Sequence, residues 1–211
     1  MCYSFRSSVI AFSLAMATVF LMYLRQSKID KLLGPVVFVY GFMQFAEALM
    51  WYDTKCGKIN KIGTCMAYYV LVLLLLAVGI GIYITDKNPI GIFIGILIFI
   101  YFFITSPKFK CSKPSTNNPN MLWGFNYYRT RIIWPLISFL ILFLSKIDKI
   151  YKFIILFWMC STYLYFLTKQ VDIKNVLKFY YDISNTVIGT KWCHFSSVSA
   201  PALYFMQNFI K

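Results

Sequence analysis

Long apolar runs dominate this sequence and recur along its whole length. A helix needs about 20 apolar residues to cross the roughly 30 Å hydrocarbon core of a bilayer, because it rises about 1.5 Å per residue. With 60% hydrophobic and 13% charged residues, the chain cannot fold as an ordinary soluble domain. Seven runs come close to or exceed the spanning length: residues 6–24, 32–52, 64–85, 89–106, 131–146, 150–168 and 192–210.

These runs are expected to be helices. Lipid offers no partner for unsatisfied backbone groups, and the runs lack the alternation of apolar and polar residues that barrel strands need. We therefore predict an all-α, polytopic integral membrane protein, a seven-helix bundle in which residues 1–211 form a single membrane domain. Six spans are the alternative, with the short fifth run and the sixth as a re-entrant pair. Pro35 and Pro89 are expected in the first turns of their helices.

Basic residues give the chain a net charge of +14 and sit mainly in the short connections between apolar runs. There they would meet the lipid bilayer and its anionic headgroups, so we expect no nucleic-acid partner. More of them fall on the face that carries the N-terminus, which places the N-terminus in the cytosol. The flanks of the first run, Arg6 against Arg25, Lys28 and Lys31, favour the reverse. A homo-oligomer is left open.

Cysteine chemistry depends on this orientation. On a cytosolic face, Cys2, Cys56, Cys65, Cys111 and Cys193 would all be free thiols. If the same face is outward, a Cys56–Cys65 or a Cys56–Cys111 disulfide becomes plausible.

One acidic residue lies inside a predicted span. Tyr40, Gln44, Glu47 and Trp51 are spaced four, three and four residues apart, which places their side chains on one stripe of the second helix. A carboxylate inside a span costs a few kcal/mol, so such acids face a bundle interior or a cavity. Glu47 is either part of a polar pocket or a polar contact that holds neighbouring helices together.

The start of the seventh run is the second polar group. It comprises Trp192, Cys193, His194, Ser196 and Ser197. With seven spans this group, the N-terminus, the Glu47 end of the second helix and segment 123–128 share one membrane face. The stripe of the second helix and this second group are together the candidates for lining a polar pocket that is closed at its far end. The alternative for His194 is an interfacial anchor.

Cys2, Glu47, Cys193 and His194 are of metal-ligand type but lack any ligand spacing, so we predict no metal and no cofactor. A hydrolase that uses Ser or Cys with His194 and Glu47 is under-determined, and catalysis of any kind is left open. Small residues at 4, 8, 11, 15 and 18, and Gly91 with Gly95, most simply allow close helix packing.

Several of these segments together resemble an uncharacterised family of multi-pass membrane proteins of giant DNA viruses, with distant bacterial relatives. The residues that carry the resemblance are Met1 to Ser4, Met43-Gln44-x-x-Glu47-x-x-x-Trp51, Asn60 to Thr64, Trp123-Gly124 and Trp192-Cys193-x-x-Ser196-x-x-x-Ala200-Pro201. The resemblance implies a viral protein in a host-derived or virion membrane and no particular activity. His194 departs from the pattern, where relatives tend to have an aromatic or small residue.

Three functions follow as hypotheses. The first is a channel- or transporter-like protein with a polar pocket around Gln44 and Glu47. The second is a membrane-embedded enzyme acting on lipid, with Glu47, Cys193 and His194 near the cleaved bond. The third is a structural or membrane-remodelling protein without a substrate.

Overall fold

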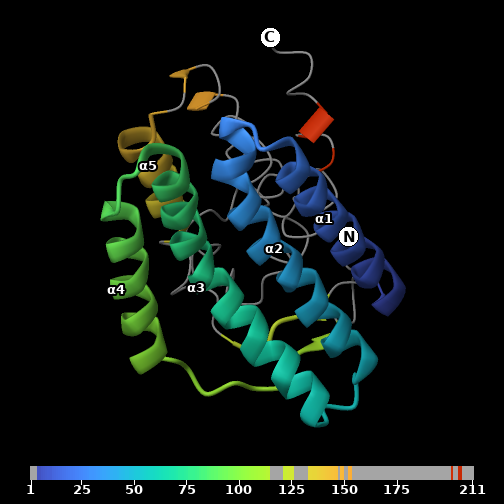
Figure 1. Ribbon diagram of the computed structural model, residues 1–211. Helices are drawn as coiled ribbons and strands as arrows, with labels where there is room; N and C mark the ends of the chain where they lie inside the picture. Colours follow the sequence, from blue (N-terminus) through green and yellow to red (C-terminus); the bar gives the residue numbers. More distant parts are fainter. Residues whose placement is uncertain are drawn as a thin grey trace, which may run out of the picture.

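The computed structural model describes residues 4–114, 121–125, 133–146, 148–149, 152–153, 201 and 204–205, and these are mostly helical (Figure 1). The predicted sixth run and the start of the seventh therefore lie outside the described residues, apart from a few isolated positions. Within the described part, the chain runs α1 (Phe5–Arg25), α2 (Lys28–Tyr52), α3 (Lys58–Asp86), α4 (Ile90–Ile104), β1 (Lys113–Pro114), β2 (Met121–Leu122) and α5 (Ile133–Leu144).

Helices α1, α2 and α3 are successive antiparallel neighbours, with α2 packed between the other two (Figure 1). Their ends are set by capping side chains. Ser4 and Ser7 form a capping box at α1, and Ser27 and Asp30 form another at α2. The Asp53 carboxylate accepts hydrogen bonds from the backbone N–H groups of Gly57 and Asn60 and so caps α3.

Three helices, α1 to α3, are long and apolar enough to cross a membrane, which is compatible with a membrane location. Their bounds lie within four residues of the first three predicted runs, except that α3 begins six residues before its run, at Lys58. Helix α4 has 15 residues and α5 has 12, so their described lengths of about 22 and 18 Å fall short of a full crossing.

Helix α2 begins four residues before the predicted run, because the Ser27–Asp30 capping box adds a turn. As a result Pro35 lies inside α2, and its placement in the first turn was wrong. The other proline was placed correctly to within one residue, since Pro89 is the residue directly before α4.

Small residues bring the helices into close contact, as predicted. Ser8, Ala11, Ala15 and Thr18 are all buried on the face of α1 that meets α2. On the other side of the bundle, a Cβ added to Gly79 would lie 2.4 Å from the backbone carbonyl carbon of Gly91. Backbones therefore touch where α3 and α4 cross, which only glycine permits.

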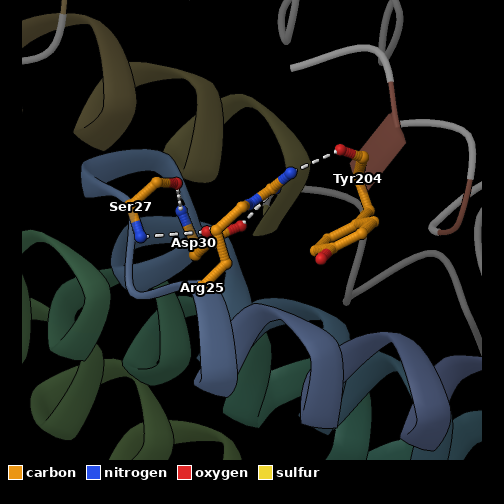
Figure 2. A network of polar contacts seen from close by, with 4 residues as sticks. All are labelled: Arg25, Ser27, Asp30 and Tyr204. Carbon is orange, nitrogen blue, oxygen red and sulfur yellow. Dashed lines mark hydrogen bonds and ion pairs between the residues drawn. The ribbon is translucent and has the colours of Figure 1, made fainter. Parts of the chain in front are cut away.

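The two ends of the helical bundle are tied differently. At one end, a disulfide joins Cys56, before α3, to Cys111, beside the short β1–β2 ladder. These two cysteines are therefore not the free thiols expected on a cytosolic face, and the alternative Cys56–Cys111 pairing is confirmed. At the other end, Figure 2 shows Arg25 reaching from α1 to Asp30 of α2 and to Tyr204. Both Asp30 carboxylate oxygens accept from the guanidinium, at 2.6 and 2.7 Å, and the carbonyl of Tyr204 accepts at 2.8 Å.

Candidate functional site

The predicted stripe of α2 is buried. Gln44 and Glu47 have no exposed surface at all, Tyr40 is 8% exposed, and Trp51 is half-buried. The neighbouring Phe45 points outward instead, with 39% of its surface exposed. The spacing of four, three and four residues therefore does place one polar face of α2 against the interior of the helical bundle.

Polar side chains gather toward the disulfide end. Among the described residues in the half of the bundle nearest the disulfide, six polar side chains have no exposed surface: Ser8, Gln44, Glu47, Asn60, Thr64 and Ser112. Beyond this region the buried side of α3 becomes a continuous apolar surface, made of residues such as Leu71, Leu74, Leu75, Val78 and Ile82. The described part of the interior is thus polar toward one end and apolar through its middle.

Asn60, Thr64 and Ser112 form a polar clasp that fastens the loop after α4 to the start of α3. The Asn60 amide nitrogen donates to the Ser112 carbonyl at 2.9 Å, while its amide oxygen accepts from the Ser112 N–H at 2.9 Å. The same nitrogen donates to the carbonyl of Met50 at 3.3 Å. Because Asn60 satisfies both backbone groups of Ser112, it acts as a strand residue would in a sheet.

The clasp continues through hydroxyl groups. Thr64 Oγ1 and Ser112 Oγ lie 2.7 Å apart, and Ser112 Oγ accepts from the N–H of Gly124 at 2.8 Å. Gly124 also accepts a hydrogen bond from Lys110 N at 2.7 Å, and a Cβ at position 124 would lie 2.1 Å from the Lys110 carbonyl oxygen. Glycine is therefore required there by close backbone approach.

Aromatic rings cover this end of the bundle. Tyr68 is fully buried, donates its hydroxyl to the carbonyl of Phe102, and has the rings of Phe109 and Phe125 within 5.5 Å. Trp123 stacks on Phe125. Segment 123–125 is thereby packed against α3, which holds the loop over the polar half of the interior.

Part of the predicted shared face is confirmed. The ring of Phe5, at the start of α1, lies 5.9 Å from that of Tyr52, at the end of α2, and segment 123–125 packs at the same end. Trp192, Cys193, His194, Ser196 and Ser197 lie outside the described residues, so their part in a pocket stays a prediction. Tyr204, later in the same run, contacts Arg25 at the opposite end.

Sequence reasoning missed two residues. Ser112 was overlooked because a serine in a polar loop carries no signal until its partner is known. Asp30 was overlooked because it lies within a basic connection, between Lys28 and Lys31, although the pattern Ser27-x-x-Asp30 is a recognisable capping signal. Among the residues that the structure describes, no group of three His, Cys, Asp or Glu side chains could hold a metal ion.

No known family, curated protein or solved structure matches this chain. The resemblance to a viral membrane family therefore stays a prediction, and the function has to be argued from the geometry.

Proposed function

We propose that this chain is a multi-pass integral membrane protein with a channel- or transporter-like function, in which Glu47 binds a proton or a small cation that enters from the disulfide end. The observation that carries the proposal is the complete burial of Gln44 and Glu47 within an apolar helix of spanning length. Acids inside spanning helices commonly mark ion or substrate pathways. Removing a carboxylate from water costs free energy, so such residues are found mainly where function requires them.

Three other described acids, Asp30, Asp53 and Asp86, have structural roles near helix ends, and a fourth, Asp148, is exposed. Asp30 and Asp53 cap helices, and Asp86 is the last residue of α3, where it accepts a hydrogen bond from Lys146 N. Glu47 lies five residues before the end of α2, about 7 Å along its axis. This depth puts the carboxylate inside the bundle yet within reach of the disulfide end.

The apolar middle of the bundle argues for a site that is closed at its far end. A continuous water-filled pore would need polar groups along its whole length, whereas the buried side of α3 from Leu71 to Ile82 is apolar in the described structure. Transport through such a site requires a conformational change, so a transporter-like cycle fits the interior better than an open channel.

The disulfide suggests how the protein is oriented in the membrane. Disulfides form and persist outside the reducing cytosol, so we propose that the Cys56–Cys111 end, which also carries the N-terminus, faces an oxidising compartment. This reverses the orientation expected from the total count of basic residues. It agrees with the flanks of the first span, where Arg25, Lys28 and Lys31 all lie at the other end.

Proton flux into proteoliposomes tests the proposal. The full chain is reconstituted into liposomes that enclose a fluorescent pH indicator. A potassium gradient with valinomycin sets the membrane potential. We expect acidification with the wild-type protein and at least tenfold less with Glu47→Gln, which keeps the shape but removes the titratable group. Asp148→Asn, which neutralises an exposed acid, serves as the matched control and should retain the flux.

A structural role is the competing proposal, supported by the backbone contact of Gly79 with Gly91 and by the close packing around it. It predicts no flux of protons with the wild-type protein, and none of Na⁺, K⁺ or Ca²⁺ in valinomycin-free vesicles that enclose an indicator for each ion. That outcome, with Glu47→Gln lowering thermal stability only, would reject the transport proposal. The lipid-directed enzyme depends on Cys193 and His194, beyond the described residues, and stays a hypothesis.

A further inference from the structure

A groove opens on the outside of the helices at the end opposite the disulfide. It has a volume of about 370 Å³ and lies between α1 and α2, with one residue from α3. Its polar mouth contains Gln26, Asp30 and Lys31. The rest of the lining consists of Val19, Met22, Tyr23, Gly34, Pro35, Phe38 and Ile84 and is largely apolar. Lys31 and Phe38 are separated by about 10 Å along the α2 axis, so the groove has a polar end and an apolar length.

The missing side chain of Gly34 opens this groove. A Cβ added to Gly34 would have no atom within 4 Å, whereas one added to Gly81 would lie 2.2 Å from the Leu32 carbonyl oxygen. Close packing therefore explains Gly81, whereas position 34 borders open space. Glycine there avoids the clash that a Cβ would make with the ring of the following Pro35, and it also leaves room for a ligand in the groove.

The charge at the mouth is positive. Asp30 lines the groove, but its two carboxylate oxygens are occupied by the bidentate contact with Arg25, and one also accepts from Ser27 N. The Asp30–Arg25 pair is therefore neutral as a unit. The exposed Lys31 therefore gives the lining its net positive charge. It lies near the start of α2, at the level where the end of a spanning helix meets lipid headgroups.

The backbone adds a hydrogen-bond acceptor. Pro35 lies inside α2 and has no N–H, so the Lys31 carbonyl one turn earlier lacks its usual helical donor. Lys31 thus offers an ammonium group and a carbonyl oxygen within the same lining. Together they suit a phosphate next to a hydroxyl group.

We propose that this groove binds one anionic phospholipid. Its phosphate contacts the Lys31 ammonium group and the Gln26 amide, a headgroup hydroxyl donates to the Lys31 carbonyl, and an acyl chain lies over Gly34 toward Val19 and Phe38. Charge complementarity favours an anionic lipid over a zwitterionic one. This site is separate from Glu47 and does not rest on the proposed transport function.

Native mass spectrometry tests the site on the full chain in detergent, with phosphatidylglycerol and phosphatidylcholine of identical acyl chains added in equal amounts. We expect one phosphatidylglycerol per chain, retained roughly tenfold more than phosphatidylcholine. Both lipids carry the phosphate, but the choline cation repels the Lys31 ammonium group and has no hydroxyl to donate to the Lys31 carbonyl. Lys31→Gln should lose this preference, and Gly34→Leu should lose both lipids by filling the groove. Lys87→Gln, an exposed lysine at the same end but outside the groove, should behave as the wild type.

Two results would overturn the proposal. One is equal retention of the two lipids by the wild-type protein, which would indicate only a non-selective lipid shell. The other is unchanged phosphatidylglycerol retention in Gly34→Leu. Lys31→Gln changes an exposed side chain and leaves the packing intact, so it tests the site even if Gly34→Leu does not fold.

Discussion

Asn60 should be among the most costly polar residues to replace. In Asn60→Ala, the N–H and the carbonyl of Ser112 would each lose a partner at 2.9 Å, and the carbonyl of Met50 would lose one at 3.3 Å. All of these contacts are buried, so water cannot easily replace the amide. A buried polar group left without a partner costs about 1–3 kcal/mol, so we expect a total loss of about 3 kcal/mol after some relaxation.

Thermal unfolding in detergent, followed by size-exclusion chromatography of heated samples, measures this loss. A destabilisation of about 3 kcal/mol should lower the midpoint by roughly 6–12 °C for a chain of this size. Asn88→Ala is the matched control, because Asn88 is partly exposed and its side chain accepts one local bond from Ile90 N. It should cost about 1 kcal/mol or less. Equal, small shifts for both variants would refute the structural role of the clasp.

Two further predictions concern packing and the disulfide. Gly81→Ala should lower stability by about 1–3 kcal/mol because its Cβ meets the Leu32 backbone. Gly34→Ala, whose Cβ meets only the neighbouring Pro35, should change stability by about 1 kcal/mol or less, and denaturant titration compares the two variants directly. Maleimide-polyethylene glycol should modify Cys56 and Cys111 only after reduction, and replacing both by serine should cost up to about 4 kcal/mol for a loop of 55 residues. Ready modification of both thiols without prior reduction would reject the disulfide and, with it, the argument for the proposed orientation.

The sequence alone predicted the features that depend on local periodicity. The ends of α1 to α3 fall within four residues of the apolar runs, except that α3 begins six residues early, because spanning length and helical rise are fixed by the chain itself. The burial of Gln44 and Glu47 followed from their spacing on one helical face, which needs no knowledge of the partner helix. The same reasoning correctly predicted close contacts at Ala15 and Gly91.

Only the tertiary structure decided the pairings between distant residues. Two disulfides were open to Cys56, and the packing of the loop after α4 chose Cys111, while Cys65 lies about two turns into α3 as a free thiol. Likewise, the sequence does not specify which residue Asn60 hydrogen-bonds. It bonds Ser112 because the same loop folds back over α3.

The buried polar stripe of α2 is thus determined by the sequence, whereas its surroundings are not. Periodicity fixes which side of a helix is buried, since the helix geometry is local. Which loop, lysine or lipid lies beside that helix depends on how separate segments approach one another in space, and no spacing along the chain encodes that approach directly.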